Sequence, residues 1–462
     1  MAIVAAFMVP HPPIAVAEVG KGEEKKIDAT LKAYEKVAEE IKNIAPDTIV
    51  VISPHTVAYS DYFHISPGAE TKGNLGQFAA PQVQFECKYD EDFVTTLCNF
   101  ITLNKVSAGT EGEQDRYLDH GTMVPLYFIN KAYKNYKLVR IGLSGLSLTE
   151  HYRLGQLIKE TAKTLDKKVV IVASGDLSHR LKKDGPYGLN PKGAIYDKKI
   201  MEVMGGGNFL ELLVFPPALC EAAGECGHRS FTIMAGALDK TKVEAQQLSY
   251  EGTFGVGYGI STFKVLGEDK SRNFLEQYLP YRDKLLQEKR DKEDPYVKLA
   301  RASLEGYVKT GKKIKVPENI LPELINNKAG TFVSLKKDGI LRGCIGTIGP
   351  VRDNIAEEII CNAISSGTED PRFLEVKENE LPELEYSVDV LGPLEDISSP
   401  KDLDTTRYGV IVTKGSRTGL LLPNLEGVDT VEKQIDIAKQ KAGIFPEEMD
   451  IKLQRFEVIR HK

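Results

Sequence analysis

Three continuous apolar segments in the first 180 residues each run into a polar segment that carries a histidine. They are residues 2–9, 48–52 and 168–173, and all are rich in valine, isoleucine or alanine. Apolar runs of this kind predict strands that are covered on both faces, as in a parallel sheet. A helix with one apolar face is predicted at 27–41, so that the first two strands form a βαβ unit. We therefore predict an α/β domain with a mostly parallel central sheet covered by helices.

The pattern changes after residue 265. Residues 266–293 are highly charged with sparse leucines, and we interpret them as a partly helical connector. The chain then restarts with an amphipathic helix, a hairpin at 331–346, another helix and alternating strands. Such a mixture without βαβ regularity is typical of an α+β domain. The predicted organisation is an α/β domain at 1–265, the connector, and a smaller α+β domain at 294–462.

Length and charge limit the function classes. At 462 residues the chain is too long for one typical domain. A net charge of −6 gives a nucleic-acid-binding role no electrostatic support. No apolar run approaches the roughly 20 residues that span a bilayer, and no basic segment precedes the first apolar run, so we expect neither a membrane anchor nor a signal peptide. The six cysteines show no Cys-x-x-Cys pair, which favours a reducing, cytoplasmic location.

The histidines that follow the three apolar strands are His11, His55 and His179. In open parallel sheets, ligands bind beyond the carboxyl ends of the strands. Prolines flank His11 on both sides and hold its backbone stiffly where the first strand ends. We therefore expect the three histidines to share one pocket.

Two neutral imidazoles and one carboxylate form the facial triad of non-haem Fe(II) oxygenases. His11 and His55 are the natural pair, and Glu225 is the best candidate for the third ligand. Cys226 is the alternative, and it would favour copper or zinc. A single loop histidine is more often only hydrogen-bonded or solvated, but two at matched strand ends favour a metal site.

Acid–base chemistry is predicted for His179 and His120, because imidazole exchanges a proton near neutral pH. Asp176 lies three residues before His179 and is expected to orient it. Alternatively, Asp176 caps a helix that begins near residue 177. His228 and Arg229 are candidates for binding an anionic group of the substrate, although either could be a surface charge.

Several motifs of the first half together resemble a known family. They are Pro10-His11-Pro12-Pro13, Ser53-Pro54-His55, Asp119-His120-Gly121, Gly175-Asp176-Leu177-Ser178-His179 and Glu225-Cys226-Gly227. These residues resemble the class III extradiol ring-cleaving dioxygenases and their Memo-type relatives. The resemblance implies Fe(II) bound by His11, His55 and Glu225, with His179 as acid–base residue and His120 assisting at substrate and O2. Memo-type proteins carry a cysteine ligand in the last motif, where this chain has Cys226.

The second half resembles the AMMECR-type domain. The resemblance rests on Leu341-Arg342-Gly343-Cys344-Ile345-Gly346 and Glu369-Asp370-Pro371-Arg372-Phe373. It implies an association with Memo-type and radical-SAM proteins, the AmmeMemoRadiSam set, and homo-oligomerisation is a habit of the family. Strand alternation places Arg342 and Cys344 on one face, where they could complete a pocket. The alternative is a packed hairpin with a buried cysteine.

The leading hypothesis is a non-haem metal-dependent oxygenase that acts with O2 on a small aromatic substrate. Ring cleavage competes with monooxygenation or oxidative decarboxylation of an aryl acid by iron or copper. A non-catalytic metal- or redox-binding assembly protein is the alternative outside enzymes. Zinc-dependent hydrolysis is a third hypothesis, since two histidines and a glutamate also suit zinc.

Overall fold

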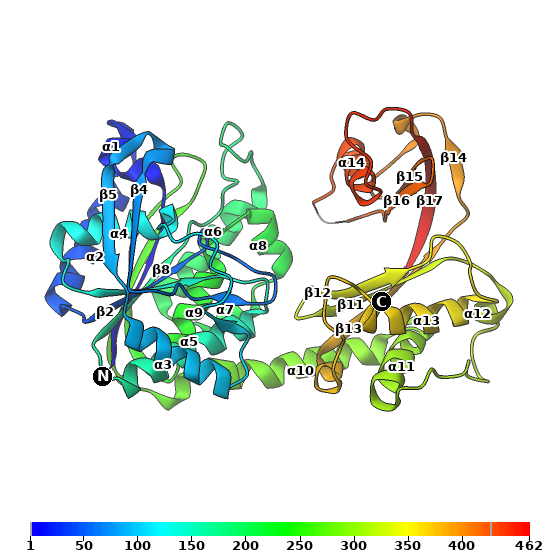
Figure 1. Cartoon of the computed structure of the whole chain (residues 1–462), viewed down its shortest axis with the longest axis horizontal. Helices are drawn as coiled ribbons and strands as arrows, with labels where there is room; N and C mark the ends of the chain where they lie inside the picture. Colours follow the sequence, from blue (N-terminus) through cyan, green and yellow to red (C-terminus); the bar gives the residue numbers. More distant parts are fainter. Residues whose placement is uncertain (1, 426) are drawn as a thin grey trace. The chain divides into compact units, whose positions relative to one another are not determined.

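A computed structural model of the protein describes residues 2–425 and 427–462 (Figure 1). The chain folds into two compact units, Met1–Tyr281 and Arg282–Lys462. The division falls inside α10 (Phe274–Lys292), the long helix of the predicted connector.

The first unit is built on a six-stranded sheet with the order β7-β2-β8-β1-β10-β9. Its four parallel strands are β7 (Lys137–Gly142), β2 (Thr48–Ser53), β8 (Val169–Ser174) and β1 (Ile3–Val9). The antiparallel strands β10 (Tyr258–Glu268) and β9 (Thr241–Glu251) complete one edge. This arrangement confirms the predicted mostly parallel sheet, and the three histidine-bearing strands β2, β8 and β1 are neighbours in it.

Helices cover both faces of this sheet, which explains why its strands are continuously apolar. On one face lie α2 (Asp28–Ile44) and α4 (His120–Ala132), which share a core cluster with Phe7 and Val172. On the other face lie α3 (Glu91–Leu103), α5 (Leu148–Thr164), α6 (Pro191–Gly206), α7 (Leu210–Val214) and α9 (His228–Ala237), with Met8 and Ile171. Consecutive strand residues thus enter opposite cores.

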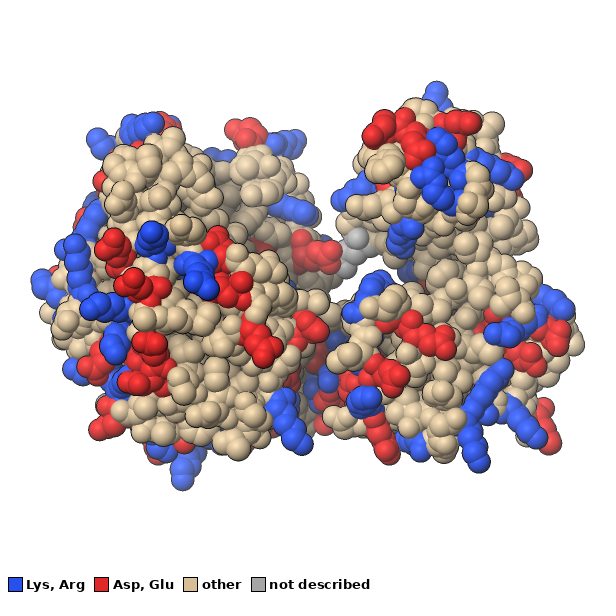
Figure 2. All heavy atoms as spheres, viewed as in Figure 1, with Lys and Arg blue, Asp and Glu red and all other residues tan. Residues whose placement is uncertain are grey.

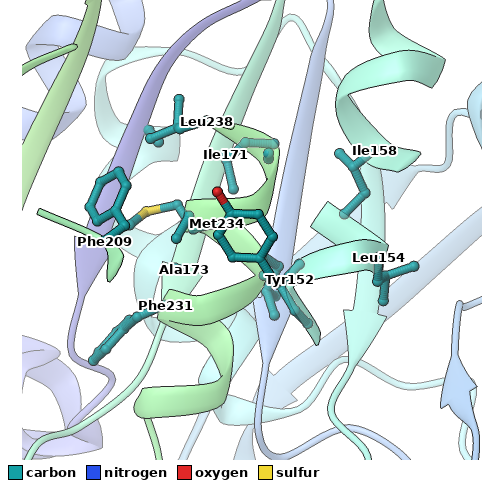
Figure 3. Close-up of a cluster of buried hydrophobic side chains, with 14 of the residues drawn as sticks. Tyr152, Leu154, Ile158, Ile171, Ala173, Phe209, Phe231, Met234 and Leu238 are labelled. Carbon is teal, nitrogen blue, oxygen red and sulfur yellow. The ribbon is translucent and has the colours of Figure 1, made fainter. Parts of the chain in front are cut away.

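Helices α5 and α9 approach each other closely over β8. Figure 3 shows Tyr152 and Leu154 of α5 with Phe231 and Met234 of α9, close to Ile171 of the strand. The close approach depends on two glycines. A Cβ atom on Gly155 would lie 2.0 Å from the carbonyl oxygen of Ile233, and one on Gly236 would lie 2.0 Å from that of Tyr152.

The substitution Gly155→Ala is therefore expected to destabilise the first unit by about 1–3 kcal/mol, because the added methyl group forces the two helix backbones apart. Gly206→Ala is the matched control, since a Cβ there meets no atom within 4 Å. Urea unfolding followed by circular dichroism would compare the two variants. Equal stability of both variants would contradict this account of the α5–α9 contact.

The segments between these elements include two small sheets. The strands β3 (Phe63–His64) and β6 (Ala108–Gly109) form one, and β4 (Glu70–Leu75) and β5 (Ala80–Lys88) form the other. Helix α4 (His120–Ala132) forms despite Pro125 in its interior. The short helices α1 (Ala17–Gly20) and α8 (Pro217–Ala223) complete the unit.

The second unit has an antiparallel sheet in the order β12-β11-β13-β17-β15-β16, with β14 (Glu395–Ile397) beside β17. Its strands are β11 (Thr331–Lys337), β12 (Ile340–Gly346), β13 (Leu384–Leu391), β15 (Tyr408–Lys414), β16 (Arg417–Leu421) and β17 (Lys452–His461). The helices α11 (Pro295–Thr310), α12 (Pro322–Asn326) and α13 (Ile355–Thr368) share one core cluster with β11 and β13. Helix α14 (Val431–Lys441) shares another with β15. The predicted α+β class is confirmed.

The surface carries charges of both signs. Figure 2 shows lysine and arginine side chains interspersed with aspartate and glutamate on the visible face of each unit. Among the described residues, no helix is both long enough and apolar enough to cross a bilayer.

Candidate metal centre

The candidate site lies where β1, β2 and β8 end. His11 follows β1, His55 follows β2, and the loop 175–179 follows β8. A second loop, residues 224–227, ends where α9 begins and lies against the first. Two glycines allow this approach, because a Cβ on Gly175 would lie 2.1 Å from the Cα of Gly227. The contact brings Cys226 to the ends of the strands.

His11 is held in one orientation. Its ring nitrogen Nδ1 lies 2.9 Å from the Ser174 hydroxyl, which donates its own proton to the carbonyl of Gly121 at 2.6 Å. The Ser174 oxygen must then accept a hydrogen bond from Nδ1–H, so that Nε2 keeps the free lone pair. Burial and the neighbouring histidines hold the pKa of His11 well below its usual value. His11 therefore presents a neutral donor atom to the site.

Three donor atoms converge here. Nε2 of His11 lies 2.9 Å from Nε2 of His55 and 3.6 Å from Sγ of Cys226. The three ligand atoms all lie within 4.8 Å of one another. Burial raises the pKa of the Cys226 thiol, so that a bound metal would have to displace its proton. Two imidazoles and one thiol are a donor set that suits copper or zinc.

His120 stacks on His55 with their ring centroids 4.1 Å apart. It is the first residue of α4, and Asp119 caps that helix by accepting the Thr122 N–H. Gly121 permits the close approach, since a Cβ there would lie 2.4 Å from the Ser53 hydroxyl oxygen. Burial lowers the pKa of His120 to about 4, so its ring is neutral at pH 7.

His179 lies at the end of the loop that follows β8. Its backbone N–H binds the carbonyl of Ala223, and its ring centroid is 5.0 Å from that of Tyr187. Burial lowers the pKa of His179 to about 4. Its Nε2 atom is buried and has no hydrogen-bond partner in the described part of the chain. The ring thus has one unused polar atom inside the protein.

Asp176 contacts His11. Its Oδ1 accepts the backbone N–H of His11 at 2.7 Å, and its Oδ2 lies 3.9 Å from the Nε2 of the same residue. The alternative of a helix cap is wrong, because residues 175–178 form an irregular loop. The Asp176 carboxylate instead accepts a hydrogen bond from the backbone of His11, and this bond links the segment after β8 to the segment after β1.

Two predictions about the last motif need correction. Glu225 does not join the His11 and His55 donors, because its Oε2 accepts the N–H of His228 at 2.6 Å where α9 begins. His228 is buried, with Nε2 bonded to the carbonyl of Leu212 and Nδ1 near the Tyr196 hydroxyl. Both ring nitrogens serve the core, so His228 is not available to a substrate. Arg229, the next residue, is exposed.

The two candidate residues of the second unit, Arg342 and Cys344, also differ in their surroundings. Arg342 makes a bidentate ion pair with Glu380, at 2.8 and 2.9 Å, and also binds the carbonyl of Leu374. It therefore anchors a neighbouring segment, as in the packed-hairpin alternative. Cys344 is half-buried, its sulfur accepts from Ser334, and burial raises its pKa.

Sequence reasoning missed the residues that support the ligands. Ser174 orients His11, and Ser53 links the His55 segment to Asp119 through hydrogen bonds. Each of these serines is the last residue of its strand, β8 or β2. A serine that ends an apolar strand just before a histidine-bearing motif was the signal available in the sequence.

Comparison with known proteins decides the family. Residues 5–261 match the model of the catalytic LigB subunit of aromatic ring-opening dioxygenase. The chain belongs to the LigB family. Its second part, residues 297–461, matches the AMMECR1 family model. The resemblances inferred from the motifs are thus confirmed for both halves.

Relatives of this LigB-family chain include proteins of full and partial length. A protein of Clostridium acetobutylicum is 45% identical over 464 residues, which cover 99% of this chain and 98% of that protein. A Thermotoga maritima protein is 51% identical over 171 residues, 37% of this chain and 98% of its own length. The crystal structure of an uncharacterized protein from Pyrococcus horikoshii is 37% identical, with a TM-score of 0.34, and covers 36% of this chain and 88% of its own.

Proposed function

We propose that this LigB-family protein is a metal-dependent oxidoreductase that uses O2 to oxidise a small aromatic substrate. The observation that supports it best is the convergence of His11 Nε2, His55 Nε2 and Cys226 Sγ at the ends of the parallel strands. Because the third donor is a soft thiol, the set favours copper over the Fe(II) that a carboxylate ligand would favour. A bound copper or iron ion would supply one-electron chemistry with O2.

The protein's own residues would handle the protons. His120 and His179 flank the donor atoms, and their pKa values of about 4 keep both rings neutral at pH 7. A neutral imidazole accepts a proton from a hydroxyl group that becomes acidic during the reaction, and returns it later. The unpartnered Nε2 of His179 is the better placed acceptor, because no other group of the described chain uses it.

A zinc-dependent hydrolase is the second candidate, and the donor set itself favours it. Histidine and cysteine are ordinary zinc ligands, and three protein ligands leave a fourth position open for water. Zinc has no redox chemistry, so that such an enzyme would work equally well without O2. Metal analysis of protein purified without added metal and without O2 separates the candidates. About one copper or iron per chain supports the oxidoreductase, and zinc supports the hydrolase.

His179→Gln is expected to lower substrate-dependent O2 uptake by about 10²- to 10⁴-fold, the usual loss when a general acid–base residue is removed. The metal content of the variant should equal that of the wild type, because His179 is not among the three donors. An oxygen electrode with a panel of phenols and catechols measures the rate. Arg153→Gln, on exposed α5 surface, is the control. An unchanged rate in His179→Gln would contradict the proton-transfer role.

A further inference from the structure

The two sequence motifs of the second unit, residues 341–346 and 369–373, meet at Cys344. The backbone N–H of Cys344 donates to Oδ2 of Asp370 at 2.9 Å, and Asp370 is buried. Arg372 donates to the same carboxylate at 2.9 and 2.7 Å and to the Cys344 carbonyl at 3.4 Å. The two motifs are therefore fixed to each other around one thiol.

Strand alternation places Cys344 on the sheet face opposite to α11 and α13. Val333 of β11 belongs to the core cluster on the helix side. Its neighbour Ser334 faces the other way and lies directly across from Cys344 in the strand register. Ser387 of β13 continues the same row. Since Cys344, Ser334 and Ser387 are all half-buried, a small molecule can reach the sulfur from this face.

Three cations surround this row. Arg372 is neutralised by the aspartate of its own motif, and Arg460 donates to the buried Asp389 at 2.7 and 3.1 Å. Lys441, the last residue of α14, donates to the Leu420 carbonyl at 3.3 Å. Among the described residues, no carboxylate lies within 4.0 Å of the Lys441 ammonium. The group as a whole therefore carries one positive charge that no side chain compensates.

Packing and electrostatics both place Lys441 near the thiol. Leu420, to which Lys441 binds, packs in one cluster with Phe332 of β11, on the same sheet face as Cys344. Burial lowers the pKa of Lys441, and the charge of Cys344 acts in the opposite direction. Burial likewise raises the pKa of Cys344, and Arg372 and Lys441 act against that increase. The ammonium and the sulfur thus lie within each other's field.

We infer that the second unit has a ligand site of its own, in which Lys441 binds the carboxylate of a small organic acid and the Cys344 thiol attacks an electrophilic carbon of that acid. In this step the sulfur forms a bond to the carbon, the leaving group departs with the electron pair of the bond that breaks, and the thiol proton passes to solvent. The site uses no residue of the metal centre, so it does not depend on the proposed oxidation.

Iodoacetate and iodoacetamide are matched probes of this site, because they share the reactive carbon and differ in charge. Each forms a C–S bond with a thiol and releases iodide. Peptide mass spectrometry on the full chain measures the two rate constants at Cys344, and the chain unfolded in urea gives their ratio without the site. The ratio is independent of the thiolate population, which affects both reagents equally. In the folded chain, the iodoacetate-to-iodoacetamide ratio should be at least about tenfold higher than in the unfolded chain, because a local positive field concentrates an anion by such factors.

Variants of α14 test the role of the lysine. Lys441→Gln should return the ratio almost to that of the unfolded chain, and Lys441→Arg should keep most of the increase. Lys433→Gln is the matched control, because it removes an equal charge from an exposed position of the same helix. Sodium acetate should slow the reaction with iodoacetate more than sodium chloride does at equal ionic strength, because acetate would occupy the site whereas chloride only screens it.

Several results would overturn the inference. One is a ratio no higher in the folded than in the unfolded chain, and another is a Cys344 that neither reagent alkylates in the folded chain. A ratio that Lys441→Gln leaves unchanged would exclude the lysine as the binding group. An equal loss in Lys433→Gln, or equal effects of acetate and chloride, would show a diffuse field in place of a site.

Discussion

The Cys226→Ser variant is expected to bind copper more than about 100-fold more weakly than the wild type. Loss of a residue that only supports a ligand costs about 10- to 100-fold in metal affinity, and loss of a ligand itself should cost more. Serine has nearly the size of cysteine, but its hydroxyl does not become the anionic soft donor that the thiol becomes. His11→Ala should lose at least as much, because Nε2 of His11 is near both other donor atoms. Competition with a chromogenic Cu(I) chelator under anaerobic conditions would measure the affinities.

Glu225→Gln makes this experiment decisive about the third ligand. The glutamine oxygen can still accept the His228 N–H, so α9 keeps its starting contact and copper affinity should stay near that of the wild type. His461→Gln, in the second unit, is the control for the histidine variant. If Glu225→Gln lost as much affinity as Cys226→Ser, or if Cys226→Ser lost none, the His-His-Cys centre would be wrong.

The Arg140→Met variant is expected to destabilise the first unit by about 3–5 kcal/mol, the cost of leaving buried charges without their partner. Arg140 is 1% exposed on β7, and its guanidinium donates to Ser66 at 2.6 Å. It lies 3.7 Å from Asp119 and 3.9 Å from Glu113. Methionine would fill most of the volume but would leave both carboxylates without this cation.

Hydrogen exchange of the β7 amides, measured by mass spectrometry on the full chain, reports the free energy of opening for this unit alone. Arg153→Met is the matched control, because that arginine is exposed and pairs with Glu150 one helical turn away. Loss of such a surface pair costs about 1 kcal/mol or less. Similar exchange in both variants would show that Arg140 contributes no more than a surface charge.

The Arg140→Met substitution should also disturb the candidate metal centre. Asp119 caps α4 just before His120 and accepts a hydrogen bond from Ser53, which precedes the His55 segment. Two of the four histidines of the site thus depend on the residue that Arg140 neutralises. A single arginine within the apolar sequence of β7 does not by itself indicate that its charge is buried and paired.

The sequence by itself determined the α/β class, the second α+β unit and the proximity of the His11 and His55 imidazoles. Continuous apolar strands are stable only in a parallel sheet covered on both faces, and their carboxyl ends lie at one edge. The residues that follow such strands, His11 and His55, must therefore be close together. The local sequence pattern was enough to predict this proximity, because the position of each histidine is defined by the strand that it follows.

Only the tertiary structure decided among neighbours in the last motif. Glu225 and Cys226 both have side chains of a type that can bind a metal, and His228 and Arg229 are both of a type that can bind anions, but Glu225 and His228 are used by α9 and the core. Adjacent side chains point in different directions, so the conformation of the loop decides which of them faces the site. That conformation depends on the contact of Gly227 with Gly175, 52 residues away in the chain. Long-range packing of this kind leaves no periodic signal in the sequence.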